Sequence, residues 1–137
     1  MAESSLMSGL AISQTKTALC HSISYPLTIR FGIPHGLACA FTMPSVLNFC
    51  LDKDDGRFRK LAKLLVYENN YKQILFKRFI EFNRFFDVNH NIRNTIKNKE
   101  SLIGLIPEMY NPERANNLIK EVQIADIKKI ILESFEL

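Results

Sequence analysis

Residues 31–51 read Phe-Gly-Ile-Pro-His-Gly-Leu-Ala-Cys-Ala-Phe-Thr-Met-Pro-Ser-Val-Leu-Asn-Phe-Cys-Leu, and none of them carries a formal charge. The stretch is long enough to cross a bilayer, which takes roughly 20 apolar residues. It also contains Pro34, Pro44 and several polar side chains, which a single membrane-spanning helix tolerates poorly. We therefore predict a buried helix of a soluble protein that begins near His35 and runs to about Phe49, with Pro44 as a kink or a break.

The segment before this stretch is rich in Ala, Ser, Gly and Thr and has few large apolar side chains. Small residues allow neighbouring helices to approach closely. We predict a first, internal helix over about residues 5–24, which needs neighbours to cover it. A turn through Tyr25 and Pro26 and a second turn at residues 32–34 follow, because the residue before a proline disfavours helical geometry.

The segment after the stretch begins with a charged turn at residues 52–56. Its aspartates can cap a helix that begins near Arg57. Apolar residues spaced at i, i+3, i+4 and i+7 then predict amphipathic helices that pack one face against a core. The positions on that face are Leu61, Leu64, Leu65, Leu75, Phe79, Phe82 and Phe86.

The rest of the chain is predicted to be helical apart from a polar connector at residues 89–99. A short helix over about residues 101–109 is followed by an Asn111-Pro112 turn with a helical turn after it, and a last helix covers about residues 125–135. No run of alternating apolar and polar residues indicates a strand. The predicted fold class is all-α, and 137 residues fit one domain over residues 1–137.

The net charge of +4 permits an anionic partner but is far from the dense Lys and Arg coverage of a dedicated nucleic-acid-binding protein. Between residues 57 and 99, eleven Lys and Arg stand against three acids and are mixed with phenylalanines, as in single-strand-binding surfaces. These phenylalanines fall mainly at the spacing of a helix face that packs against a core. We therefore expect them to be buried in the core, beneath a basic face that is solvated. The alternative is a basic helical module that binds nucleic acid or another partner without catalysis.

The cysteines Cys20, Cys39 and Cys50 indicate neither a disulfide framework nor a zinc knuckle. Their number is odd, no two of them form a C-x-x-C pair, and all three sit among apolar residues. A reducing cytoplasm is therefore the expected location. The first residues also show no basic segment before an apolar stretch, so no secretory signal is visible.

Histidine is rare in this chain, so the placement of its three histidines is informative. His21 and His35 are separated by two prolines and cannot share one helix face. If the intervening loop folds back, the two imidazoles can bind one divalent transition metal together with further ligands. By spacing alone, two core histidines bonded to backbone carbonyls explain the pattern better, because metal sites normally need at least three protein ligands. His90 lies in the polar connector and is expected to be a solvated loop residue.

The sequence of residues 11–49 resembles the iron-containing alcohol dehydrogenases. In that family a helix carries a histidine, a loop follows, and Pro-His-Gly opens a run of small and apolar residues; here Cys20-His21-Ser22 and Pro34-His35-Gly36 match this pattern. The Asn111-Pro112 pair and the final helix resemble the end of the same family. The resemblance implies the all-helical C-terminal domain of the iron-containing alcohol dehydrogenase and dehydroquinate synthase-like fold.

The resemblance also implies an activity and a metal site. Family members transfer hydride between NAD(P) and an alcohol or aldehyde carbon, while a metal acts as a Lewis acid on the substrate oxygen. One aspartate and three histidines hold the metal in that family, and His21 and His35 match the last two ligands. Fe(II) or Zn(II) is the expected ion. Many members carry another histidine four residues after the first of these; here Tyr25 stands there, as a candidate pocket residue without a firm catalytic role.

The nucleotide-binding half of the family is expected to be missing from this chain. None of the five glycines forms a glycine-rich pyrophosphate loop, so no cofactor-binding residue is assigned, and NAD(P) binding requires that N-terminal half. The aspartate and the first histidine ligand are absent too, so we expect an incomplete site, weak and unselective metal binding, and no activity from this chain alone. The expected partners are a small alcohol or aldehyde in the intact enzyme, and either a second copy of the chain or the missing half.

Overall fold

A computed structural model describes residues 2–65 and 69–137, and within these ranges every regular element is helical. The predicted all-α fold class is therefore confirmed. No helix of the described residues has both the length and the apolar character needed to cross a membrane. In chain order the elements are α1 (Ala2–Gln14), α2 (Leu19–Phe31), α3 (His35–Cys50), the 3-10 turn η1 (Leu51–Lys53), α4 (Arg57–Leu64), α5 (Tyr71–Phe85), α6 (Val88–Thr95), α7 (Lys99–Gly104), α8 (Ile106–Met109), α9 (Pro112–Ala115) and α10 (Ile124–Glu136).

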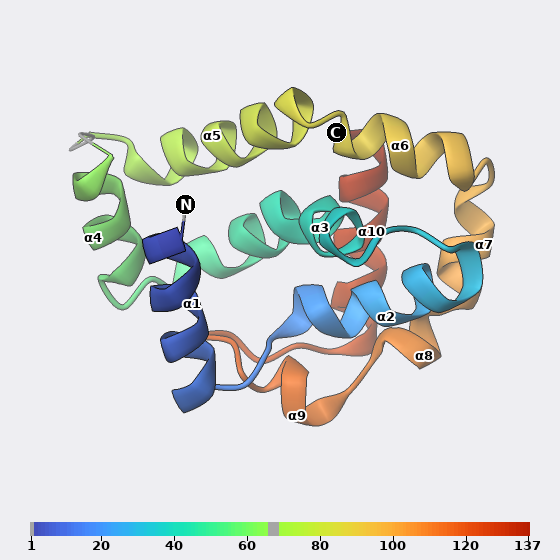
Figure 1. Cartoon of the computed structure of the whole chain (residues 1–137), viewed down its shortest axis with the longest axis horizontal. Coiled ribbons are helices and arrows are strands. Elements are labelled where there is room, and N and C mark those ends of the chain that lie inside the picture. Colours follow the sequence, from blue (N-terminus) through green and yellow to red (C-terminus); the bar gives the residue numbers. More distant parts are fainter. Residues whose placement is uncertain (1, 66–68) are drawn as a thin grey trace.

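Helix α3 lies in the middle of the molecule and packs against α2, α5, α6 and α10 (Figure 1). Its uncharged sequence suits this position, because its buried residues run from Ala38 to Cys50. Phe41 is among the largest fully buried side chains of the main core, which α3 shares with α2, α6 and the C-terminal helices. The predicted buried helix is confirmed, and it passes Pro44 without a break.

Helix α2 corrects the turn that was predicted at Tyr25 and Pro26, because both residues lie inside this helix. A proline inside a helix removes one backbone hydrogen bond and costs about 3 kcal/mol. Leu19, Ile23 and Leu27 repeat every four residues along α2 and have no exposed surface. Burying such side chains contributes about 1.5–3 kcal/mol each, which offsets the cost of the proline.

The turn predicted at residues 32–34 is confirmed. Gly32 ends α2 with a left-handed backbone at φ 66°, and its N–H donates to the Thr28 carbonyl at 3.0 Å. Glycine adopts this conformation without the steric cost that a side chain would add. Residues 32–34 reverse the direction of the chain, so that α3 begins beside α2.

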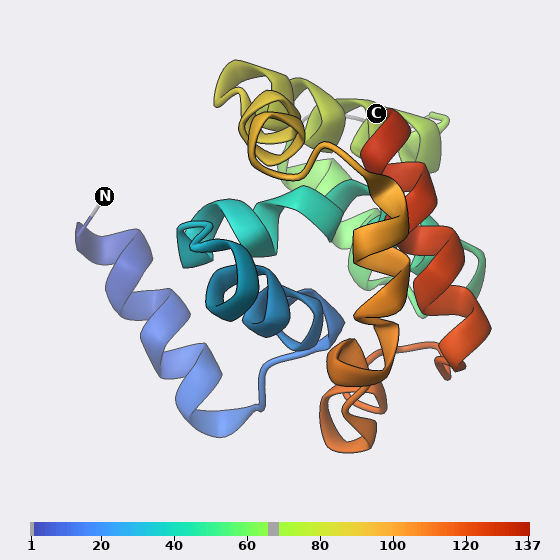
Figure 2. The same cartoon turned by 90° about the vertical axis from the view of Figure 1, so that its right-hand side faces the viewer.

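The helix predicted over residues 5–24 is two helices, and the first of them is not internal. Helix α1 ends at Gln14, and every one of its described residues is exposed. Figure 2 shows it apart from the other helices, joined to them through the segment before α2. Its large apolar side chains are too few to form a buried face here, and Leu6, Met7 and Leu10 are each more than half exposed.

A second, smaller core joins α4 and α5 to the end of α3. Its buried members are Leu47, Leu51, Ala62 and Leu75, and the partly buried Phe58, Leu61, Tyr71, Phe76 and Phe79 pack against them. This part of the predicted apolar face is confirmed.

The remaining positions of that predicted face are exposed. Leu64 and Leu65 lie at or just after the end of α4, and Phe82 and Phe86 lie near the end of α5; all four side chains are exposed. Asn83 takes the inward position instead, and its side-chain amide donates to the Ala40 carbonyl at 2.8 Å. Helical spacing predicted the periodicity but not which residues of α5 face α3. Glu68, one of the three acids counted in the basic region, lies outside the described residues.

The polar connector predicted at residues 89–99 is wrong, because α6 occupies most of it. Val88 and Ile92 are buried on one face of α6, and this two-residue apolar signal is too short to show a helical period. His90 therefore lies on a helix rather than in a loop; it is exposed, as expected, with Nε2 2.7 Å from the Asn94 amide nitrogen.

The C-terminal third agrees with the prediction more closely. The helix predicted over residues 101–109 is divided at Leu105 into α7 and α8. Asn111 caps α9, and α10 begins with a capping box formed by Gln123 and Asp126.

Asp54 closes the charged turn before α4. Its carboxylate accepts from the amides of Gly56 and Phe58 at 2.8 and 3.0 Å and from the Tyr71 hydroxyl at 2.8 Å. Burial raises the pKa of Asp54, but the hydrogen bonds from Tyr71 and the amides outweigh burial, so the pKa lies below its ordinary value. The predicted capping by an aspartate of this turn is confirmed.

We expect Asp54→Ala to lower the free energy of unfolding by about 1–2 kcal/mol, because α4 loses its cap. Since the folded-state pKa is lowered, this contribution is complete above the unfolded-state pKa and is lost as the pH falls through the folded-state value. Urea denaturation at neutral and acidic pH measures both effects. Asp55→Ala is the control, because Asp55 pairs with the exposed Arg57 side chain; equal losses in the two variants would contradict the role given to Asp54.

Candidate metal centre

His21 and His35 meet although they belong to different helices. His21 lies in the first turn of α2, and His35 is the first residue of α3. Their ring centroids are 5.3 Å apart, with an angle of 61° between the ring planes. The fold-back that the sequence analysis required of the intervening segment is present, so the two imidazoles can reach one cation.

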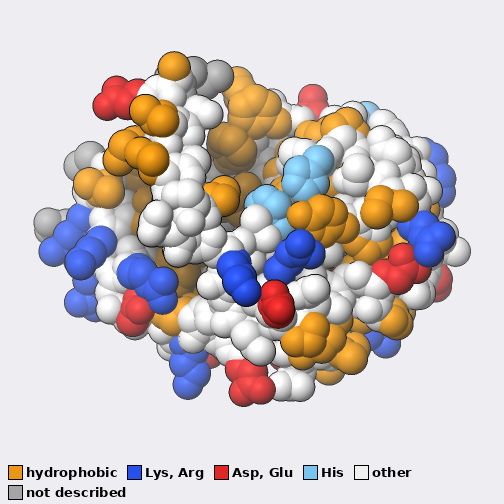
Figure 3. Space-filling model, turned by 60° about the horizontal axis from the view of Figure 1, so that its bottom comes forward, with side chains coloured by type: hydrophobic (Ala, Val, Ile, Leu, Met, Phe, Trp, Pro, Cys, Tyr) orange, Lys and Arg blue, Asp and Glu red, His pale blue; other side chains and the backbone are white. Residues whose placement is uncertain are grey.

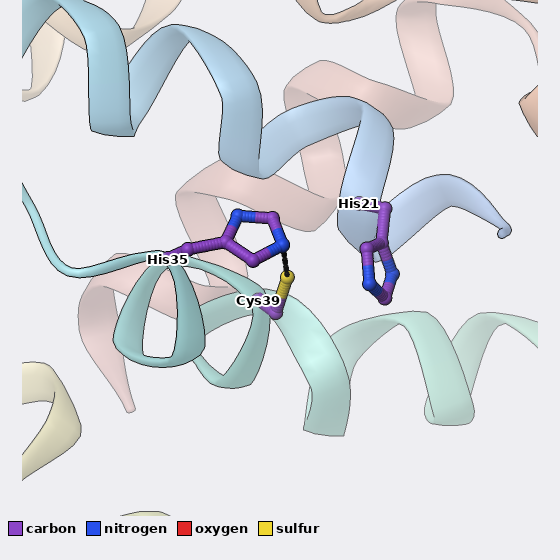
Figure 4. Close-up of side chains that lie close together, drawn as sticks. All are labelled: His21, His35 and Cys39. Atoms are coloured by element: carbon purple, nitrogen blue, oxygen red, sulfur yellow. Dashed lines mark hydrogen bonds between the residues drawn. The ribbon is translucent and has the colours of Figure 1, made fainter. Parts of the chain in front are cut away.

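Cys39 adds a third donor side chain that the sequence analysis did not assign. Its Sγ lies 3.6 Å from His35 Nε2, and one donor atom from each of His21, His35 and Cys39 lies within 4.8 Å of the other two. Figure 4 shows the sulfur between the two rings. The signal that points to Cys39 is its i, i+4 spacing from His35, which places both side chains on one face of a helix.

Ser24 determines which nitrogen of His35 is free. The Ser24 hydroxyl donates to the His21 carbonyl at 2.8 Å, and its oxygen lies 3.3 Å from His35 Nδ1. Because the hydroxyl proton is already donated, this oxygen can only accept a proton from Nδ1–H. Nε2, which faces Cys39, therefore keeps its lone pair. A metal-binding histidine is commonly oriented by such a hydrogen bond from its other nitrogen.

The protonation of the other two donors follows from their surroundings. Partial burial lowers the pKa of His21, and electrostatic interactions with the neighbouring His35 and Arg114 lower it further. Neutral imidazole is the form that binds a metal ion. Burial raises the pKa of the Cys39 thiol, so in the absence of a cation the sulfur carries its proton at neutral pH.

Tyr25 lies beside the histidine pair. Its ring centroid is 5.7 Å from that of His35, and the guanidinium of Arg114, on α9, lies 4.6 Å from the centroid of the Tyr25 ring. Tyr25 is 38% exposed, so it borders the approach from solvent. Arg114 was not predicted as a site residue, because it is far from Tyr25 along the chain and no sequence pattern indicates that the two side chains are in contact.

The donor group is open to solvent on one side. His35 is exposed, and His21 and Cys39 are partly buried. Figure 3 shows two adjacent histidine side chains at the surface, next to a hollow and bordered by hydrophobic, Lys and Arg side chains. A metal ion or a small polar molecule can therefore reach these donors without a change in the fold.

Comparisons with known proteins assign the chain to a family. The model of the Fe-containing alcohol dehydrogenase family, C-terminal, matches residues 1–135. Among similar proteins, a phosphonoacetaldehyde reductase from Streptomyces viridochromogenes is 50% identical over 42 residues, which are 31% of this chain and 11% of the relative.

Two further relatives match longer segments. An NADPH-dependent butanol dehydrogenase from Clostridium saccharobutylicum is 29% identical over 91 residues, 66% of this chain and 24% of the relative. A 1-propanol dehydrogenase from Salmonella typhimurium is 35% identical over 65 residues, 46% of this chain and 18% of the relative. The matched segment thus spans less than a quarter of the length of each of these relatives.

We expect Ser24→Ala to release the His35 ring from its single tautomer, because Nδ1–H loses its acceptor. Nitrogen-15 NMR of the imidazole, recorded at a pH where His35 is neutral, should show protonation at Nδ1 in the unchanged chain and a mixture of tautomers in the variant. Ser22→Ala is the matched control, because the Ser22 hydroxyl donates to the Met109 carbonyl instead. Protonation at Nε2 in the unchanged chain would contradict the hydrogen-bond direction assigned to Ser24.

Proposed function

Because the chain belongs to the Fe-containing alcohol dehydrogenase family, we propose that it supplies His21 and His35 as metal ligands to an enzyme that interconverts small alcohols and aldehydes with NAD(P). The observation that carries the proposal is the convergence of the two imidazoles, with ring centroids 5.3 Å apart, on two helices of the buried core. The names of the similar proteins, which are alcohol dehydrogenases and aldehyde reductases, support the same class of reaction.

The donor set present fits a divalent transition metal such as Fe(II) or Zn(II). The lowered pKa of His21 favours the neutral imidazole that binds metal, and the hydrogen bond between Ser24 and His35 Nδ1 leaves Nε2 facing Cys39. The aspartate and the first histidine of the family's ligand set are not part of the donor group of the described residues. When bound, the metal would supply a Lewis acid for the substrate oxygen.

The residues of this chain would orient and admit the substrate. Ser24 is hydrogen-bonded to the His35 ring, and the packing of α2 against α3 keeps the two histidines next to each other. Tyr25 and Arg114 border the approach, and the guanidinium can donate hydrogen bonds to an oxygen of an entering aldehyde or alcohol. The free cysteines suit a reducing cytoplasm as the location.

NAD(P) would bind to a nucleotide-binding half contributed from outside the described fold. The exposed apolar side chains of α1, including Leu6, Met7 and Leu10, give a surface that such a half, or a second copy of the chain, can cover. We propose that the chain by itself uses this surface to associate with a second copy.

Nucleic acid is the weaker alternative. Phe82, Phe85 and Phe86 are exposed, which contradicts the expectation that this pattern hides its aromatic rings. The ring centroids of Phe82 and Phe85 lie 4.8 and 4.9 Å from that of Phe86, with the rings at steep angles to one another. Rings in mutual edge contact offer fewer free faces for base stacking than separate rings do.

We expect calorimetric titration with Zn(II), and with Fe(II) under anaerobic conditions, to show one ion bound per chain. His21→Ala and His35→Ala should each weaken binding by about tenfold or more, because each variant removes an imidazole ligand. His90→Ala is the matched control, since this exposed histidine lies on α6 and is not part of the donor group. Unchanged affinity in both His21→Ala and His35→Ala would contradict the proposed ligands.

The same variants test the reaction in a chimera in which residues 1–135 replace the corresponding segment of the similar butanol dehydrogenase. His35→Ala should abolish NADPH-dependent aldehyde reduction, and His90→Ala should preserve it. Aldehyde reduction that survives His35→Ala would exclude a catalytic metal held by this residue.

Analytical ultracentrifugation tests the surface of α1. We expect the unmodified chain to sediment partly as a dimer, and the variant with Leu6→Ser, Met7→Ser and Leu10→Ser to sediment as a monomer, because the exposed apolar area is removed. Helical content measured by circular dichroism should change little, since none of these residues is buried. A monomer at all concentrations of the unmodified chain would contradict self-association through α1.

A further inference from the structure

We propose that Cys39 is a third ligand, so that this chain by itself carries a site of two imidazoles and one thiolate for a thiophilic divalent metal ion. The inference rests on the proposed function, in which His21 and His35 bind a metal, and adds to it a ligand outside the expected set of one aspartate and three histidines. It is carried by the positions of the three donor atoms and by the hydrogen bonds that orient them.

The distance between His35 and Cys39 suits a common ion. A tetrahedral zinc ion with bonds of about 2.0–2.1 Å to nitrogen and about 2.3 Å to sulfur places those two atoms about 3.6 Å apart. His35 Nε2 and Cys39 Sγ are 3.6 Å apart. Because both residues lie on one turn of α3, the helix itself maintains this spacing.

His21 can complete the group by a small movement. The three donor atoms lie within 4.8 Å of one another, whereas two nitrogen ligands of one tetrahedral ion are about 3.3 Å apart. The difference is at most about 1.5 Å, which a change in the side-chain torsions of a partly buried His21 can supply. Neither helix has to move.

The hydrogen bonds around the group leave the ligand atoms available. Ser24 accepts from His35 Nδ1–H, so the lone pair of Nε2 faces the sulfur. When an ion binds, the S–H bond of Cys39 breaks, the proton leaves to solvent, and the sulfur forms a bond to the ion without any change in oxidation state. The fourth position of the ion stays open to the solvent side, where His35 is exposed.

A thiolate ligand changes which ions the chain prefers. Sulfur favours Zn(II), Co(II) and Fe(II) over Mg(II) and Ca(II), whose preferred ligands are oxygens. Three donors held by two packed helices also require less ordering on binding than two imidazoles on a flexible loop. The sequence analysis predicted weak and unselective metal binding because it considered only the two histidines as ligands. A third ligand at Cys39 predicts tighter and more selective binding.

Titration of the purified chain with Co(II), followed by absorption spectroscopy, tests the proposal. We expect ligand-field bands together with an ultraviolet charge-transfer band from thiolate to Co(II). Cys39→Ala and Cys39→Ser should both lose the charge-transfer band and bind about tenfold or more weakly. The matched control is Cys50→Ala, which removes a buried thiol from the same helix and should keep the band.

The outcomes separate this inference from the proposed function. Ligand-field bands that depend on His21 and His35, without a charge-transfer band, would overturn the role of Cys39 and leave the histidine pair standing. A charge-transfer band that persists in Cys39→Ala would also overturn it, because another thiol would be the ligand. An absence of Co(II) binding by the folded chain would contradict both.

A second measurement does not depend on any substitution. Zn(II) should slow alkylation of Cys39 in the unmodified chain, as followed by mass spectrometry of the labelled peptide, because a coordinated thiolate is shielded from the reagent. Mg(II) at the same concentration should leave the rate unchanged. Equal rates with and without Zn(II), at concentrations where calorimetry shows binding, would overturn the proposal.

Discussion

The packing of α2 against α3 is the constraint on which the rest of the structure depends. Leu19, Ile23 and Leu27 on α2 share one core with Ala38 and Phe41 on α3, and all five are almost completely buried. Because apolar burial is the largest favourable term in folding, these contacts keep α2 helical through Pro26 and hold the two helices together. The histidine pair is a consequence of this packing rather than of any attraction between the rings.

Hydrogen bonds from buried hydroxyl groups favour one relative position of the packed helices. The Ser22 hydroxyl donates to the Met109 carbonyl on α8, and Ser134 on α10 donates to Ser45 on α3 at 2.8 Å. A buried hydroxyl without a partner is costly, so these bonds favour one register of the helices over its neighbours. Ser24 follows the same rule at the edge of the core, where its hydrogen bonds orient His35. The donor group is therefore held by the core beneath it.

The position of the donors also bears on function. They lie where the core meets solvent, with Tyr25 and Arg114 beside them. A metal ion bound at the proposed site would be supported by the packed helices beneath it and open to an entering molecule on the solvent side. A thiolate at Cys39 would let the segment retain an ion when it is separated from the ligands of the remaining enzyme.

The sequence by itself determined the all-α class, the buried helix from His35, the turn at Gly32 and the capped turn at Asp54, because these depend on local charge, backbone freedom and neighbouring residues. It failed where distant packing decides the outcome: Pro26 lies in a helix, α6 replaces a connector, and α1 stays exposed. It identified His21 and His35 only through the family pattern. The i, i+4 spacing within α3 places Cys39 next to His35. The tertiary structure alone brought His21 and Arg114 to this group, because distances between side chains on separate helices depend on how those helices pack, which no local pattern specifies.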